Sequence, residues 1–191
     1  MRDFIKTEII KLQTITQQIL DDKNIILTVE KIVKECIDCY KNGNKILFAG
    51  NGGSAADSQH LAAELVSRLK FNRAGLAAIA ITTDTSILTA IGNDYGFETL
   101  FSRQIEALGN KGDVFFAIST SGNSANIIQA INTAKTKKIK VIGLTGQDGG
   151  KMADICDFII KIPTTDTAKI QECHIMLGHT ICALIEKKIF S

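Results

Sequence analysis

The sequence predicts an α/β protein with one doubly wound, parallel sheet of five strands. Beyond about residue 44, five short apolar segments alternate with stretches of helical pattern. Apolar residues within these segments are nearly continuous, as expected for strands that helices cover on both faces. Two of the segments also end in polar, glycine-containing turns that open helices. Ligands bind at such turns, because they lie at the carboxyl edge of a doubly wound sheet.

Two helices are predicted before the first strand. Apolar side chains recur at helical spacing over Asp3–Leu20 and again over Ile25–Lys41. Asn42-Gly43-Asn44 ends the second helix, since glycine is favoured just beyond a helix C-terminus. These helices and the last one carry broad apolar stripes, more than a five-stranded sheet readily covers. The stripes therefore indicate packing between subunits.

The predicted strands follow in order as five short apolar runs: Lys45–Gly50, Leu76–Ile81, Val114–Ser119, Lys140–Thr145 and Phe158–Ile162. Helical patterns follow the first strand to about Leu69 and the third strand to about Lys137. Pro163 closes the fifth strand, and a last helix is predicted over Thr167–Ile189. We expect residues 1–191 to form a single domain, with helices of 1–42 at a subunit interface and 43–191 as the α/β core with its C-terminal helix.

Composition narrows the functional class. The formal net charge is +2, and 45% apolar with 22% charged residues is ordinary for a globular protein. The basic patch Lys135–Lys140 is interpreted as a helix C-terminus, so no nucleic-acid partner is predicted. No apolar run approaches a membrane span, and Met1–Glu8 is charged where a signal peptide is apolar. Five cysteines, an odd number, favour a reducing compartment, and Cys36–Cys39 is interpreted as a helical pair. We expect a cytoplasmic protein with no membrane partner.

The two polar turns are the strongest indication of a ligand. Asn51-Gly-Gly-Ser54 follows the first strand, and Ser119-Thr-Ser-Gly-Asn-Ser124 follows the third. Free N–H groups and the positive dipole end at a helix start bind anions. Serine and asparagine are also ordinary helix caps. Four hydroxyls in six residues nevertheless favour a phosphate, whose oxygens accept short hydrogen bonds; they belong to Ser119, Thr120, Ser121 and Ser124.

His60 and Glu64 could carry chemistry near the first turn. They are four residues apart in a predicted helix, so they share one face with Cβ atoms roughly 5–6 Å apart. An imidazole and a carboxylate at this spacing can bind a divalent metal or divide acid and base roles. An ordinary exposed pair on a helix surface is the alternative.

The last helix holds two of the three histidines. Glu172 and His174 are most simply solvated or interface residues. His179 lies between apolar neighbours, which favours a buried neutral imidazole. Gln171 and His179 are about 12 Å apart along the helix axis, because the rise is roughly 1.5 Å per residue. If both serve one centre, they should come from different subunits.

Together these motifs resemble the sedoheptulose-7-phosphate isomerases, the phosphoheptose isomerases of the SIS domain superfamily. The resemblance covers essentially the whole chain, and the combination of Glu64, Gln171 and His179 is its most diagnostic part. The motifs are Asn51-Gly-Gly-Ser54 with His60 and Glu64, Gly92-Asn-Asp94, Ser119–Ser124, Leu144-Thr-Gly146, and Gln171-Glu-Cys-His174 with His179.

The resemblance implies an aldose–ketose isomerase with a Rossmann-like fold. It would convert D-sedoheptulose 7-phosphate into D-glycero-D-manno-heptose 7-phosphate through an enediol, as the first step of bacterial heptose biosynthesis. Glu64 and His179 would transfer the protons. One zinc ion per subunit would be held by His60, Glu64, Gln171 and His179. The family resemblance also implies a homotetramer with its sites at subunit interfaces.

By the same resemblance, the hydroxyls of the second turn would hold the phosphate. The sugar would contact Glu64, Gln171 and the following residues: Asn51, Gly52, Gly53, Ser54, Asn93 and Asp94. Asp57 and Arg68 would support the site from the same helix face. The chain departs from some relatives at Ala168, where they carry an acidic residue; a proton relay through a carboxylate there is not expected.

Two other functions fit parts of this pattern. One branch of the group is a non-catalytic binding factor for the replication initiator, which keeps the glycine-rich turn but loses the acid and base residues. Glu64 and His179 are present here, and this favours the enzyme. An isomerase of another sugar phosphate is the second alternative, because a phosphate turn recognises only the phosphate.

Overall fold

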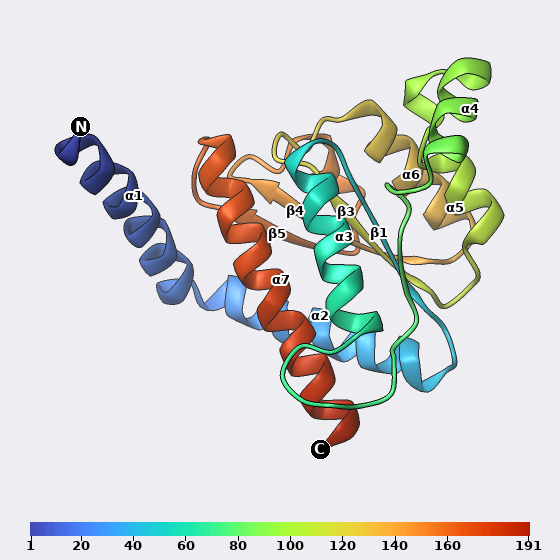
Figure 1. Cartoon of the computed structure of the whole chain (residues 1–191), viewed down its shortest axis with the longest axis horizontal. Helices are drawn as coiled ribbons and strands as arrows, with labels where there is room; N and C mark the ends of the chain where they lie inside the picture. Colours follow the sequence, from blue (N-terminus) through green and yellow to red (C-terminus); the bar gives the residue numbers. More distant parts are fainter.

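The computed structural model describes residues 1–191 and contains one sheet of five strands, all parallel. The strand order is β2-β1-β3-β4-β5, so the sheet reverses its direction of growth between β1 and β3. Ligands of doubly wound sheets bind at this switch point. The predicted fold class is confirmed (Figure 1). The strands are β1 (Ile46–Gly50), β2 (Ala78–Ala80), β3 (Val114–Ile118), β4 (Lys140–Gly146) and β5 (Phe158–Ile162).

Strand limits differ slightly from those predicted. The strand expected over Leu76–Ile81 shortens to Ala78–Ala80, because β2 is an edge strand that pairs only with β1. The strand β4 extends to Gly146, since its last residues pair with β5 as far as Ile162. Phe158–Ile162 forms as predicted.

Helices cover both faces of the sheet (Figure 1). One face carries α2 (Lys23–Lys41), α3 (Gly53–Val66) and α7 (Thr167–Phe190); the other carries α4 (Thr85–Tyr95), α5 (Ser102–Leu108) and α6 (Ala125–Thr136). Successive strand residues point to opposite faces. Phe48 and Phe116 therefore stack at 4.9 Å under α3 and α7, whereas Leu47 and Phe115 pack toward α5 and α6.

Helix α1 (Arg2–Asp21) projects from the body of the molecule (Figure 1). It buries only Ile15 and Ile19 in this chain. Leu12 is partly buried, and the remaining large apolar side chains of this helix are exposed: Phe4, Ile5, Ile9, Ile10 and Leu20. The predicted excess of apolar helix surface is therefore present. None of the helices combines the length and apolarity that a membrane crossing needs.

Helices α3 and α7 run parallel and side by side (Figure 1). Each begins at the carboxyl edge of the sheet, α3 after β1 and α7 after β5. Gln171 near the start of α7 lies against Gly53 at the start of α3, and farther along Gly178 faces Leu61. A Cβ on Gly178 would lie 2.6 Å from Leu61 Cδ2, so glycine allows the close approach of the two helices.

His174 of α7 is fully buried, which corrects the prediction that it is a solvated or interface residue. Its Nε2 lies 3.1 Å from the Thr145 carbonyl oxygen and donates to it, while Nδ1 is buried without a partner. Burial lowers the pKa of His174 to about 4, although the bond to Thr145 opposes this shift. The imidazole is therefore neutral in the folded protein near neutral pH.

We expect His174 to make folding less favourable in mild acid. Between pH 6.5 and 4 the unfolded chain binds a proton at this imidazole that the folded chain does not. The free energy of unfolding should therefore fall as the pH is lowered, by about 2 kcal/mol from this group between pH 7 and 5. Urea unfolding of the parent and of His174→Gln at both pH values measures the effect. An equal loss in both proteins would contradict it.

Candidate active site

Three side chains form a polar cluster between α3 and α7. His60 and Glu64 lie one turn apart on α3, and His179 reaches them from α7. His60 Nε2 lies 2.9 Å from His179 Nε2 and 3.1 Å from Glu64 Oε1, and His179 Nε2 lies 4.0 Å from Glu64 Oε1. The Glu64 side chain is 20% exposed and those of His60 and His179 are 51% and 40% exposed, so a ligand can reach all three.

The geometry of the cluster suits a divalent metal. One nitrogen or oxygen atom from each of the three side chains lies within 4.8 Å of the others. Two imidazole nitrogens and a carboxylate oxygen are typical zinc ligands, and zinc–ligand bonds of about 2.0–2.1 Å place tetrahedral ligands about 3.3 Å apart. The distances in this cluster bracket that value. The donor set therefore fits the predicted zinc ion.

One expectation about His179 is wrong. Its apolar neighbours Leu177 and Ile181 are buried, but the imidazole itself is partly exposed because it points along the α3–α7 seam. The two histidines of this helix thus have the reverse of their predicted environments. Glu64 and His179 lie together within this one chain, because α3 and α7 are neighbours on the same face of the sheet.

Gln171 does not join this cluster within the chain. It lies two turns before His179 on α7, and its side-chain amide packs against Gly53. A Cβ at Gly53 would lie 2.6 Å from this amide, so a larger residue there would displace the Gln171 side chain. The preceding Gly52 has φ of 55°, a conformation that glycine adopts without strain. Gln171 therefore borders the glycine-rich turn and can contact a ligand bound to it.

The second polar turn brings its hydroxyls together. Ser119 Oγ lies 2.9 Å from Ser124 Oγ and 3.5 Å from Ser121 Oγ. Ser124 is the N-cap of α6, yet its side chain does not cap the helix. The N–H groups of Ser124 and Ala125 have no acceptor in the protein. The turn thus presents both hydroxyl and backbone donors at a helix N-terminus, which suits an anion.

Asn126 connects the two polar turns, and the sequence reasoning missed it. Asn51 and Asn126 exchange two amide hydrogen bonds of 2.9 Å each, and Asn126 is buried. This pair fixes the glycine-rich turn after β1 beside the start of α6. No sequence signal identifies it, because the partners are 75 residues apart.

A cavity of about 280 Å³ lies beside the second turn. Thr120 and Ser121 form one side of it, and the turn after β4 and Thr164–Thr167 form the others. The turn after β4 packs closely, since Gly122 O accepts from Met152 N and Gly146 N donates to Thr120 O. The lining of this cavity is almost wholly polar, which suits a phosphorylated sugar.

The structure does not bring Asn93 and Asp94 to either turn within this chain. Both are exposed on α4, where Asn93 Nδ2 donates to Asp94 Oδ1 at 2.8 Å. Asp94 lines a separate hollow between α4 and α5. Gly92, the residue before Asn93, does border the cavity of about 380 Å³ at Asn51.

Asp57 lies on α3 one turn before His60. Its Oδ2 is buried without a partner, and burial raises the pKa of Asp57 to about 6 against the opposing effect of His60.

Arg68, the other predicted supporting residue, is exposed and forms no hydrogen bond or ion pair. The arginine that contacts this region is Arg73, whose Nη2 donates to the Glu64 carbonyl oxygen at 2.8 Å. Ala168 occupies the position at which some relatives carry an acidic residue. Its backbone N–H donates to the side chain of Asp166, the N-cap of α7.

Comparisons with known proteins identify the family of the chain. The SIS domain family model matches residues 11–146. Phosphoheptose isomerase of Aneurinibacillus thermoaerophilus is 56% identical over 190 residues, covering 100% of this chain and 96% of that protein. Phosphoheptose isomerase 2 of Campylobacter jejuni is 55% identical over 190 residues, with 100% and 94% covered. The solved structure of phosphoheptose isomerase GmhA from Neisseria gonorrhoeae is 44% identical with a TM-score of 0.91, covering 97% of this chain and 98% of that one. The chain belongs to the SIS domain family and, within it, to the phosphoheptose isomerases.

Proposed function

We propose that this enzyme converts D-sedoheptulose 7-phosphate into D-glycero-D-manno-heptose 7-phosphate, the first step toward bacterial heptose. One observation carries the proposal: Glu64 Oε1 lies 4.0 Å from His179 Nε2 in an accessible cluster, whose residues His60 and Glu64 belong to the helix that the first polar turn opens. A carboxylate and an imidazole so placed can reach adjacent carbon and oxygen atoms of one substrate. The family matches support the same reaction class.

The reaction moves two protons. One leaves C1 of the ketose and returns to C2, while the C2 carbonyl oxygen gains a proton and the C1 hydroxyl loses one. We assign the carbon-bound proton to Glu64 and the oxygen-bound proton to His179. The second turn, with Ser119, Ser121 and Ser124, binds the phosphate and so holds the reacting carbons in place.

We further propose one zinc ion per subunit. His60, Glu64 and His179 would hold it, and it would stabilise the enediolate as a Lewis acid. A ligand atom cannot bind the metal and a proton at once, so Glu64 and His179 would alternate between the two roles. The predicted fourth ligand, Gln171, packs against Gly53 of its own chain. Because Gln171 and His179 are about 12 Å apart along α7, we propose that Gln171 of a second subunit supplies that ligand.

We also propose a cytoplasmic homotetramer. The exposed apolar face of α1 supplies surface to bury between subunits. All five cysteines are free, which supports a reducing compartment.

Turnover tests the proposal directly. The purified enzyme should convert sedoheptulose 7-phosphate, with the aldose detected by NMR, and should leave unphosphorylated sedoheptulose unchanged at the same concentration. Conversion of a different ketose phosphate in preference would show another sugar-phosphate isomerase. No turnover, together with binding to the replication initiator, would support the non-catalytic alternative.

Mixed oligomers test whether Glu64 and His179 act within one subunit. We expect that mixing Glu64→Gln with His179→Ala restores no activity, because every site would lack one of the two groups. Subunit exchange is checked by native mass spectrometry of the mixture. Activity well above that of either variant would place the two groups in different subunits.

A further inference from the structure

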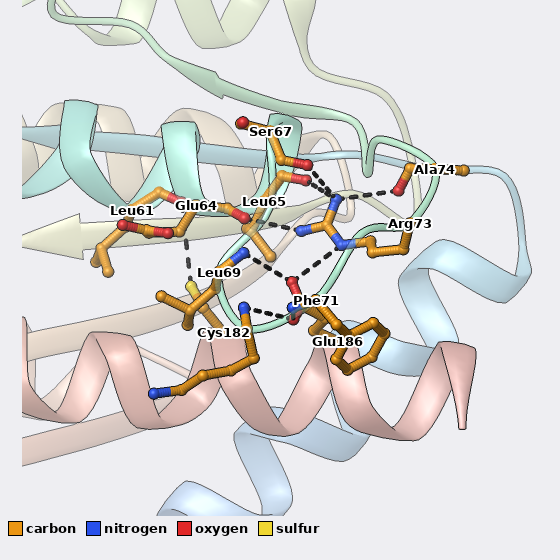
Figure 2. A network of polar contacts seen from close by, with 11 residues as sticks. Leu61, Glu64, Leu65, Ser67, Leu69, Phe71, Arg73, Ala74, Cys182 and Glu186 are labelled. Atoms are coloured by element: carbon orange, nitrogen blue, oxygen red, sulfur yellow. Dashed lines mark hydrogen bonds and ion pairs between the residues drawn. The ribbon is translucent and has the colours of Figure 1, made fainter.

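A buried ion pair joins the far ends of the two helices that carry the cluster (Figure 2). Arg73 lies in the segment after α3, and Glu186 lies near the end of α7. Arg73 Nε is 3.1 Å from Glu186 Oε2, and the two side chains are 2% and 0% exposed. The mechanism proposed above uses neither residue.

Glu186 holds the segment after α3 by its backbone. Its two oxygens accept from the N–H groups of Leu69, Lys70 and Phe71 at 2.8–3.1 Å. Burial alone would raise the pKa of Glu186, but these three donors and Arg73 outweigh it and hold the pKa below the usual range. The carboxylate is thus charged and fully bonded within the protein.

Arg73 caps the carboxyl end of α3. Its guanidinium donates to the carbonyl oxygens of Glu64 at 2.8 Å and Leu65 at 2.7 Å, and also to Ser67 and Ala74 at 3.0 Å (Figure 2). The last carbonyls of a helix lack partners within the helix, so these bonds fix where α3 ends. One of the two helix carbonyls belongs to Glu64 itself.

The ion pair therefore couples α3 to α7 through the backbone of Glu64 on one side and, on the other, about two turns beyond His179. Glu186 lies two turns after His179 on α7, and Arg73 bonds directly to the backbone of Glu64. The segment that Glu186 holds also lines, with His179 and Thr180, a cavity of about 820 Å³. Beside the cluster, where Gly178 precedes His179 and Leu61 follows His60, the contact of Gly178 with Leu61 sets how closely the helices approach. Buried ion pairs contribute little net stability compared with apolar packing, but this one fixes how the helices lie relative to each other.

We propose that Arg73 and Glu186 are positioning residues, which hold Glu64 and His179 at their working separation and thereby raise kcat. This inference rests on the proposed isomerase function. Displacement of a reacting group by about 1 Å can cost about 10²-fold in rate. Substrate affinity depends mainly on the phosphate turn, which these residues do not contact.

Two variants and one control separate positioning from stability. Arg73→Lys keeps the charge but loses the planar fork, and Glu186→Gln keeps the volume but loses the charge. Asp113→Asn is the control: Asp113 is buried and accepts from Lys45 N, Lys45 Nζ and Asn110 N, but it lies at the amino edge of β3. Well below the unfolding temperature, kcat should fall about 10- to 100-fold in the first two variants, with KM changed less than about threefold. The control should lose thermal stability and keep kcat within about twofold.

Imidazole NMR provides a readout that is independent of turnover. The chain has three histidines, so their ¹⁵N signals can be assigned individually. In the Arg73 and Glu186 variants, signals of His60 and His179 should shift while that of His174 stays. If the parent does not isomerise sedoheptulose 7-phosphate, the proposed function is wrong. The His60 and His179 signals then still show whether Arg73 and Glu186 position the cluster. Unmoved His60 and His179 signals, or kcat within twofold of the parent, would overturn the inference. Glu186→Asp, which retains the charge, replaces Glu186→Gln if that variant does not fold.

Discussion

Glu64→Gln is expected to lower kcat by about 10²–10⁴-fold, which is the usual contribution of a general acid or base. The amide keeps the volume of the side chain and can still contact His60, but it cannot accept a proton from carbon. Because Glu64 is partly exposed and its backbone carbonyl still accepts from Arg73, the fold should be unaffected. Steady-state kinetics and circular dichroism measure the two effects.

Glu172→Gln is the matched control for this prediction. Glu172 is an exposed carboxylate on α7 that pairs with Lys169 and lies outside the cluster. Its conversion to an amide should change kcat by less than about twofold, since exposed ion pairs contribute little. If Glu64→Gln retains activity within threefold of the parent, Glu64 is not the base.

Removing two hydroxyls of the second turn should produce the next largest effect. Ser119→Ala combined with Ser124→Ala eliminates two donors to a charged phosphate, each contributing about 1.5–3 kcal/mol. Affinity for sedoheptulose 7-phosphate should therefore fall by about 10²-fold or more. The two hydroxyls bond to each other, so changing both leaves neither without its partner. Isothermal titration with the phosphorylated sugar measures the loss.

Thr136→Ala serves as the control for the double variant. Thr136 ends α6, the helix that Ser124 begins, and its hydroxyl bonds only to Thr133 O at the surface. Binding should be unchanged in this protein. If the serine double variant also binds normally, the phosphate lies elsewhere.

Local residue patterns were sufficient to predict the architecture. A strand that helices cover on both faces has a continuous run of apolar residues, as Val114–Ile118 does. Such a run can be recognised from the sequence alone. The polar turns after β1 and β3 were found because short-range chemistry defines them: glycines at strand ends and hydroxyls at a helix start. The shared face of His60 and Glu64 likewise follows from helix periodicity alone.

Long-range contacts could not be predicted in this way. His179 reaches His60 across 119 residues, and only the packing of α7 beside α3 brings them together. The apolar neighbours of His179 indicated burial, but exposure depends on which way the residue points relative to the adjacent helix. The Asn51–Asn126 pair and the Arg73–Glu186 pair have no local pattern at all.

The sequence by itself determined the sheet, its covering helices and the chemical types that surround a phosphate, because these depend on periodicity and on turns of a few residues. Only the tertiary structure decided that Glu64 and His179 meet in one cluster within the chain. It also decided that Gln171 contacts Gly53 and not this cluster, and that His174 is the buried histidine. The first two outcomes depend on the register of two parallel helices, and the third depends on the packing of α7 against β4. That register is set by a glycine contact and a buried ion pair between residues more than 100 positions apart.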